Sequence, residues 1–370
     1  MRPFSLLIKP AGASCNLRCE YCFYLHHLDP KHPAPRMSEE ILEHLVKSYM
    51  ETPQPVYGFA FQGGEPTLMG HKFYQKVVEF QKKFGKSRSQ VANGFQTNGI
   101  GITDELGDLF HHYKFLVGVS MDGPPEIHNL YRKNVKGKPT HQMVMNGIKT
   151  LQKHQVEFNI LTLVTQANVK RAKQVYRYLK KQEFYFHQYI PCVEWKSDNR
   201  LESFSITGEE WGQFLIDIFD EWAKEDIHRV SIRHLDSIVE FLVYGSYNVC
   251  QMGRSCNTYL VVEANGDVFP CDFFVRDDLK LGNIMENTWD ELLNSELLEK
   301  FAQHKTKYSN SCRECEFLRF CNGDCQKFRS YSDWTQPSGL SSLCSGWQRF
   351  YEHALPPLKE IVQTKILNKG

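Results

Sequence analysis

Three cysteines near the N-terminus are spaced closely enough to bind one metal centre. They are Cys15, Cys19 and Cys22. Three thiolates can hold three irons of a four-iron, four-sulfur cluster and leave the fourth iron without a protein ligand. A substrate or cofactor can bind at such an open iron. The alternative is a zinc site completed by His26 or His27, because zinc prefers four closed ligands.

A second group of cysteines lies in the last third of the chain. Its members are Cys250, Cys256, Cys271, Cys312, Cys315, Cys321, Cys325 and Cys344. With Cys192, the chain has 12 cysteines in all. The apolar run from Phe4 to Ile8 is too short for the core of a signal peptide, so a reducing cytosol is expected. Free thiols clustered at short spacings there favour metal over disulfides, and zinc ribbons are the alternative to iron.

Polar and glycine-rich motifs follow several predicted strands. The first is Gln62-Gly63-Gly64-Glu65-Pro66, in which two glycines allow the backbone to approach a ligand closely. Later ones are Gln96-Thr97-Asn98-Gly99 and Ser120-Met121-Asp122-Gly123-Pro124. Polar groups gathered at successive strand ends are what a barrel active site needs. Plain turn chemistry is the alternative at each position.

Alternating strands and helices must position these motifs up to about residue 195. The predicted strands are Ser5–Lys9, Tyr57–Gln62, Val91–Gln96, Phe115–Met121, Phe158–Val164 and Phe184–Ile190. Ser38 and Asn168 can each cap an amphipathic helix between them. Such alternation implies parallel pairing with right-handed crossovers. The pattern predicts an α/β fold with a closed or partly closed β/α barrel over residues 1–195.

The pattern changes after Trp195. A helical connecting segment is predicted for residues 196–249, and its first helix opens with a capping box at Thr207 and Glu210. Residues 250–370 form a small loop-rich domain that ends in a helix and that folds around its metals. Within it, Asn265-Gly266 marks a hairpin between two short apolar runs.

Composition excludes several classes of protein. Lys and Arg number 44 and Asp and Glu 43, so the net charge of +1 attracts neither nucleic acid nor an anionic membrane. No apolar run approaches the ~18 residues of a spanning helix. Hydrophobic residues make up 41% of the chain, which suits a globular, cytoplasmic protein.

The order of these motifs resembles the radical S-adenosylmethionine (radical SAM) superfamily. The cysteine spacing after the first strand, Tyr21 before the last cysteine, and Gly63-Gly64-Glu65 about 40 residues later carry the resemblance. The C-terminal array resembles the seven-cysteine SPASM pattern, with Cys250 as an eighth thiol. The chain as a whole resembles the anaerobic sulfatase-maturating enzymes, including its Ser-Leu-Leu-Ile-Lys-Pro and Phe-Pro-Cys-Asp-Phe stretches. This family implies a radical SAM partial (β/α)6 barrel followed by an iron–sulfur SPASM domain.

The resemblance implies a role for each matching residue. Cys15, Cys19 and Cys22 bind the catalytic cluster. Tyr21, Gly64, Ser120, Arg132 and Val193 fall on positions that bind S-adenosylmethionine. Cys250, Cys256, Cys271 and Cys325 hold one auxiliary cluster, and Cys312, Cys315, Cys321 and Cys344 hold the other. The census of three 4Fe-4S clusters then leaves only Cys192 without a role.

The implied activity is that of an oxidoreductase that converts a cysteine or serine of a sulfatase to formylglycine. A deoxyadenosyl radical removes a β-hydrogen, a base takes the thiol or hydroxyl proton, and the nearer auxiliary cluster takes the electron. Asp272 occupies the proton-acceptor position, although it can equally serve only to order the loop around Cys271. Tyr24 and Gln62, next to two of the motifs, are expected to face the target side chain.

The implied partners are an unfolded or nascent sulfatase with a Cys/Ser-x-Pro-x-Arg motif and an electron donor such as flavodoxin or ferredoxin. Two other function classes stay open. One is a SPASM enzyme that forms thioether or carbon–carbon crosslinks in a peptide, and the other is a non-catalytic iron–sulfur electron carrier. An electron carrier has no use for Gly63-Gly64-Glu65 or for a cluster with an open iron. A neighbouring sulfatase gene would favour maturation over crosslinking.

Overall fold

The computed structural model describes residues 1–27, 34–198, 200–329 and 339–366. It divides into two compact units, each built from pieces that lie far apart in the sequence. The first unit contains residues 1–120, 132–158 and 256–302, and the second contains residues 121–131, 159–255 and 303–370. Residues 256–302 therefore pack with the N-terminal part of the chain.

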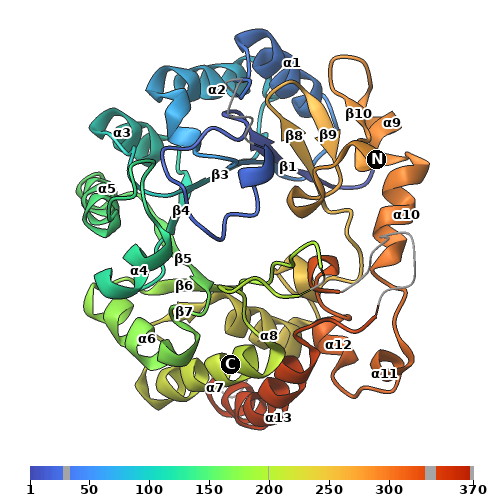
Figure 1. Cartoon of the computed structure of the whole chain (residues 1–370). Helices are drawn as coiled ribbons and strands as arrows, with labels where there is room; N and C mark the ends of the chain where they lie inside the picture. The colour runs from blue at the N-terminus through green and yellow to red at the C-terminus, as the bar shows by residue number, and fades with distance from the viewer. Residues whose placement is uncertain (28–33, 199, 330–338, 367–370) are drawn as a thin grey trace. The chain divides into compact units, whose positions relative to one another are not determined.

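A twisted sheet forms the centre of the first unit, in the order β10-β9-β8-β1-β2-β3-β4 (Figure 1). Strands β1 to β4 pair in parallel, β8 pairs in parallel with β1, and β9 and β10 continue the sheet in antiparallel fashion. The strands are β1 Ser5–Lys9, β2 Tyr57–Phe61, β3 Val91–Thr97, β4 Leu116–Ser120, β8 Tyr259–Glu263, β9 Asp267–Phe269 and β10 Gly282–Asn283.

Helices connect and cover these strands. They are α1 Glu39–Met50, α2 His71–Phe84, α3 Asp104–His112, α5 His141–Lys153, α9 Trp289–Leu293 and α10 Glu296–His304, with 3-10 turns at η1 Leu25–His27, η2 Pro66–Met69, η5 Asp272–Phe274 and η6 Asp277–Leu279. The predicted cap of α1 is confirmed, because Ser38 Oγ accepts a hydrogen bond from the Ile41 amide at 3.2 Å. Its buried face contains Tyr49, whose hydroxyl donates to the Phe4 carbonyl at 2.7 Å.

The second unit contains the parallel strands β5 to β7 and a set of longer helices. Its strands are β5 Phe158–Val164, β6 Phe186–Pro191 and β7 Ser231–Ile232. Its helices are α4 Pro125–Tyr131, α6 Ala172–Lys181, α7 Gly208–Glu225, α8 Arg233–Tyr244, α11 Asn310–Arg313, α12 Leu318–Cys321 and α13 Cys344–Ile361, with short turns at η3 Val169–Arg171, η4 Cys250–Met252, η7 Gln326–Phe328 and η8 Val362–Ile366. None of the helices in the described ranges is both long and apolar enough to cross a bilayer.

The predicted strands up to residue 195 are confirmed as β1 to β6, with ends shifted by at most two residues. The hairpin at Asn265-Gly266 is confirmed as the turn between β8 and β9, with Gly266 at φ +88°. The capping box of α7 at Thr207 and Glu210 is also confirmed.

The predicted cap at Asn168 is wrong. A 3-10 turn precedes α6, and the Asn168 side chain makes no capping hydrogen bond. Its amide instead donates to the carbonyls of Asp122 and Leu163 at 3.1 and 3.0 Å. A buried asparagine that satisfies strand-end carbonyls has the same sequence signature as a cap, because both uses precede an apolar helical face.

Helices α7 and α13 approach each other through glycines. A Cβ added at Gly346 would lie 2.0 Å from the Gly208 carbonyl oxygen, and one added at Gly212 would lie 2.6 Å from Gly346 Cα. This contact lies in the first turn of α13, which begins at Cys344. The close helix crossing therefore determines where the last cysteine of the C-terminal array lies.

We predict that Gly346→Ala lowers the free energy of unfolding by about 1–3 kcal/mol, because the added methyl group forces the helices apart. It should also lower iron retention, since Cys344 moves with the first turn of α13. Thermal unfolding and iron content of the anaerobically prepared protein measure the two effects. Glu352→Ala, an exposed change on the same helix, is the control. Unchanged stability and iron content in Gly346→Ala would contradict the argument.

Candidate active site

The pairing of β8 with β1 places Lys9 opposite Glu263. Lys9 is 1% exposed, and its ammonium lies 3.8 Å from a Glu263 carboxylate oxygen and 3.7 Å from the centre of the Tyr24 ring. The Tyr24 hydroxyl donates a short hydrogen bond to the same carboxylate. Burial lowers the pKa of Lys9 and raises the pKa of both Glu263 and Tyr24. Tyr24 is thus held in place by a hydrogen bond to Glu263 and by contact of its ring with Lys9.

The carboxylate of Asp272 is held from both sides. It follows Cys271 at the start of η5, directly after the β8–β9 hairpin. Gln62 Nε2 donates to one oxygen at 3.1 Å, and the Tyr259 hydroxyl donates to the other at 3.0 Å. The same hydroxyl lies 3.3 Å from Cys271 Sγ. The structure therefore brings together two of the predicted residues, Gln62 and Asp272, and adds Tyr259 to them.

The N-terminal cysteines lie on a loop that immediately follows β1. Two N–H groups donate to Cys15 Sγ. The Leu17 backbone amide lies 3.3 Å from the sulfur, and the Asn98 side-chain amide lies 3.8 Å from it. Burial raises the pKa of Cys15 to about 11, and the nearby Cys22 adds to the rise. A neutral thiol gains little from donors, whereas an iron-bound thiolate is stabilised by them. The donor set therefore fits an iron–sulfur cluster.

The loop after β2 is fastened to this cysteine loop. The Gly64 amide donates to the Gly12 carbonyl at 2.8 Å, and a Cβ at Gly64 would lie 2.1 Å from the Ser14 carbonyl oxygen. Glu65 is 1% exposed and accepts hydrogen bonds from Thr97 Oγ1 at 2.7 Å and from the Asn98 amide at 2.8 Å. Glycine is required at position 64 by this close approach, so the loop can present its backbone beside the cysteines.

The remaining residues predicted for S-adenosylmethionine lie in both units. Ser120 is the last residue of β4 and is partly exposed. Arg132 is 9% exposed, and its guanidinium carbon lies 5.4 Å from the centre of the Tyr21 ring. Val193 lies in the second unit and is fully buried. Tyr21 and Arg132 are thus neighbours within the first unit.

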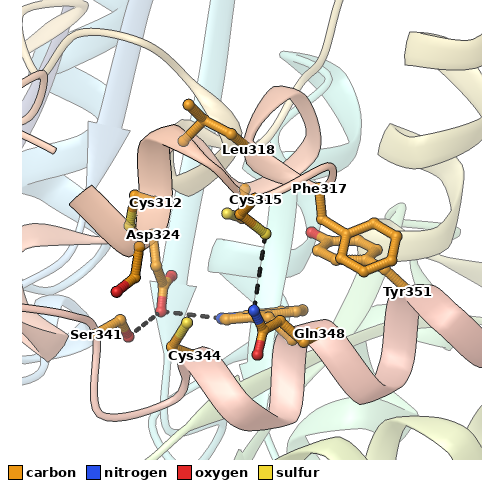
Figure 2. Close-up of a pocket in the computed structure, with 13 residues that line it drawn as sticks. Cys312, Cys315, Phe317, Leu318, Asp324, Ser341, Cys344, Gln348 and Tyr351 are labelled. Atoms are coloured by element: carbon orange, nitrogen blue, oxygen red, sulfur yellow. Dashed lines mark hydrogen bonds between the residues drawn. The ribbon is translucent and has the colours of Figure 1, made fainter. Parts of the chain in front are cut away.

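A pocket in the second unit collects one of the predicted auxiliary ligand sets. Cys312, Cys315, Cys321 and Cys344 all line it, together with aromatic residues that include Tyr351 (Figure 2). Burial, with smaller contributions from neighbouring groups that include the other thiols, raises the pKa of Cys321 to about 12 and that of Cys344 to about 11. Four thiols that line one largely apolar pocket suit a four-iron cluster, whose irons would bind them as thiolates.

The other predicted auxiliary set is divided between the units. Cys256 and Cys271 belong to the first unit, and Cys250 and Cys325 belong to the second. Cys192, which has no predicted role, is 3% exposed, and burial raises its thiol pKa. It is a core residue at the end of β6, and its amide donates to the Val164 carbonyl at 2.9 Å.

Sequence reasoning missed Lys9, Glu263 and Tyr259. All three lie at the ends of β1 and β8, and their role depends on the pairing of those strands. The signal that was present is the charged residue at the end of each strand: Lys9 closes Ser-Leu-Leu-Ile-Lys and Glu263 closes Tyr-Leu-Val-Val-Glu. Opposite charges at the ends of two apolar strands indicate pairing only when the strands are already known to be neighbours.

Comparisons with known proteins agree with the fold. Residues 10–179 match the model of the radical SAM superfamily, and residues 250–316 match that of an iron–sulfur cluster-binding domain, SPASM. These matches confirm the predicted fold class and the prediction of iron–sulfur clusters.

Full-length relatives are also found. A cysteine-type anaerobic sulfatase-maturating enzyme of Clostridium perfringens is 37% identical over 97% of this chain and 98% of its own. A serine-type enzyme of Bacteroides thetaiotaomicron is 37% identical over 100% of this chain and 93% of its own. The solved structure of native anSMEcpe with bound AdoMet and Cp18Cys peptide matches with a TM-score of 0.91 at 37% identity, over 98% of this chain and 99% of that one. On these grounds the chain belongs to the anaerobic sulfatase-maturating enzymes of the radical SAM superfamily.

Proposed function

We propose that the protein oxidises a cysteine or serine side chain of an unfolded or nascent sulfatase to formylglycine. One observation supports this proposal above the others. Asp272 follows the cluster ligand Cys271, and its two carboxylate oxygens accept hydrogen bonds from Gln62 and Tyr259. With these roles, a proton acceptor and an electron acceptor would lie side by side, and oxidation of a side chain that carries a heteroatom needs both.

The N-terminal cluster and S-adenosylmethionine supply, when bound, the radical that removes a β-hydrogen from the target side chain. Cys15, Cys19 and Cys22 would hold that cluster. Tyr21, Gly64, Ser120, Arg132 and Val193 would bind S-adenosylmethionine, with the Arg132 guanidinium at its carboxylate. The attachment of the Gly64 loop to the cysteine loop supports this assignment, because it fixes one wall of the cofactor site relative to the cysteines.

Asp272 would take the proton of the target thiol or hydroxyl. A carbon radical gives up its electron more easily once the neighbouring heteroatom is deprotonated, so the base must act close to the electron acceptor. Tyr259 bonds to one oxygen of Asp272 and lies against Cys271, which supports a fixed orientation of the carboxylate beside the cluster ligand. The other oxygen, bonded to Gln62, would face the substrate.

Gln62 and Tyr24 would orient the target side chain. Gln62 lies one residue before the Gly63-Gly64 pair, and its amide already bonds to the proposed base. Tyr24 is 5% exposed and is fixed by Glu263 and Lys9, so its ring can form a rigid wall. Fixed partners on both sides of a reacting group reduce the loss of conformational freedom that the group must undergo to reach the transition state.

Incubation with S-adenosylmethionine and a reductant under anaerobic conditions tests the proposal. The substrates are two peptides that differ only in Cys-x-Pro-x-Arg or Ser-x-Pro-x-Arg, and mass spectrometry after aldehyde trapping detects the product. Aldehyde in either peptide supports the proposal, and the ratio of the two rates gives the side-chain preference. A thioether or carbon–carbon crosslink without aldehyde would refute it.

The electron donor is proposed to be a flavodoxin or ferredoxin.

We predict roughly twelve irons per chain after anaerobic reconstitution, which is three four-iron clusters. Joint replacement of Cys15, Cys19 and Cys22 by alanine should leave about eight irons and abolish cleavage of S-adenosylmethionine, because only the cluster with the open iron is lost. Cys192→Ala should keep the full iron content. Iron and zinc analysis measures both, and zinc in place of iron would contradict the assignment.

We predict that Gln62→Ala and Tyr24→Phe slow peptide conversion more than they slow unproductive cleavage of S-adenosylmethionine, because both side chains act on the target residue. The two rates are measured in parallel by mass spectrometry. Gln81→Ala is the control, since this buried amide on α2 bonds to Asn93 of β3 at 2.9 Å and to none of the proposed site residues. Equal losses of both rates in Gln62→Ala and Tyr24→Phe would indicate a packing role instead.

The sharpest prediction concerns Asp272→Asn, which keeps the shape of the side chain and removes the proton acceptor. Iron content and deuterium transfer from a β-deuterated peptide into deoxyadenosine should persist, because hydrogen abstraction precedes deprotonation. Formylglycine should fall by about 10²–10⁴-fold, the usual scale for loss of a general base.

Asp267→Asn is the matched control, because it makes the same chemical change on β9, where the carboxylate pairs with Lys280. Undiminished aldehyde formation in Asp272→Asn, with all iron present, would disprove the role of Asp272. Loss of iron from Asp272→Asn would show instead that Asp272 orders the loop around Cys271.

A further inference from the structure

A lysine is completely buried in the second unit beside two cysteine-bearing segments. Lys305 follows α10 and is 0% exposed. Its ammonium donates to the Gln251 carbonyl at 2.7 Å and to the Asp324 carbonyl at 3.0 Å. Gln251 follows Cys250, and Asp324 precedes Cys325. One ammonium therefore joins the two segments whose cysteines are proposed to ligate the same auxiliary cluster.

The surroundings of Lys305 contain dipoles rather than an opposite charge. Within the described ranges its ammonium bonds to these two carbonyls and forms no ion pair with a carboxylate. The Asp324 carboxylate is engaged elsewhere, with Ser341 at 2.7 Å and the Trp347 indole at 2.9 Å (Figure 2). A buried charge is costly unless a partner of opposite sign compensates it. The residues alone do not supply that partner.

The neighbouring loop is shaped to hold this arrangement. Asn322, Gly323 and Asp324 all have positive φ, at 44°, 71° and 64°. Arg329, a second buried cation, donates to the Gly323 carbonyl at 2.8 Å, and Asn322 Nδ2 donates to the Met252 carbonyl at 2.6 Å. A left-handed backbone is strained at non-glycine residues such as Asn322 and Asp324, so it persists there only where the surrounding contacts determine it. These contacts hold the backbone before Cys325 against the turn that begins at Cys250.

We propose that Lys305 is a positioning residue whose buried positive charge stabilises the reduced form of the auxiliary cluster bound by Cys250 and Cys325. A four-iron cluster with four thiolates carries net negative charge, and reduction adds one more. Net charge, hydrogen bonding and solvent exposure determine the reduction potential of such clusters. A fixed cation therefore raises the potential and makes the cluster a better acceptor of the substrate's electron. This inference rests on the proposed function for its physiological meaning.

The test is a redox titration of the full-length, reconstituted enzyme, followed by electron paramagnetic resonance without peptide. Lys305→Met keeps the length of the side chain and removes the charge. It should lower the reduction potential of one auxiliary cluster by at least about 59 mV, which corresponds to a tenfold change in the one-electron equilibrium constant. Auxiliary transitions are those that remain after Cys15, Cys19 and Cys22 are replaced. Lys305→Arg should restore the wild-type potential.

Two further variants separate charge from structure. Lys307→Met removes an exposed lysine two residues away and should leave every transition unchanged. Lys305→Gln retains a hydrogen-bond donor without charge, so it decides the question if Lys305→Met loses iron. Lower potential in Lys305→Gln than in Lys305→Arg, at equal iron content, supports the proposal. Equal potentials in these two variants overturn it. Because no peptide is present, this result is independent of whether the enzyme forms formylglycine.

Discussion

The parallel pairing of β8 with β1 is the contact on which the active site depends. It adds residues 256–302 to the edge of the N-terminal sheet and aligns Lys9 with Glu263. Glu263 supplies the carboxylate that faces the buried Lys9, and loss of that carboxylate alone would leave a buried charge unpaired, which costs several kcal/mol. The same pairing positions the β8–β9 hairpin, which is followed by Cys271 and Asp272. The proposed base and the proposed cluster ligand beside it are therefore positioned by strand register rather than by a flexible loop.

Local sequence signals predicted most of the β/α arrangement. They did not predict the contacts that depend on strand register. Hydrophobic patterning was sufficient for β1 to β6, and the Asn265-Gly266 turn was sufficient for the hairpin, because both signals are contained within a few residues. The cap proposed for Asn168 failed because its side chain satisfies carbonyls on another segment. Nothing in the sequence around Tyr259 indicates that its hydroxyl contacts Asp272, since that contact requires the β8–β9 hairpin to fold back on itself.

The same distinction holds for the candidate site. Cysteine spacing was enough to predict ligand sets, and the structure collects Cys312, Cys315, Cys321 and Cys344 around one pocket. What spacing does not show is how buried charge is distributed around the ligands. Lys9 and Lys305 both lie in the interior near predicted ligands, and each owes its environment to chain segments that are distant in sequence. Buried lysines are uncommon enough that their positions add information that motifs lack.

The account makes one central claim, that Asp272 receives the proton of the target side chain beside its electron acceptor. A crystal structure of the reconstituted enzyme with S-adenosylmethionine and a Cys-x-Pro-x-Arg peptide tests this claim most directly. The account predicts that the target sulfur lies within hydrogen-bond distance of an Asp272 carboxylate oxygen, with Gln62 next to it. A target sulfur outside hydrogen-bond reach of Asp272, with another base beside it, would contradict the account.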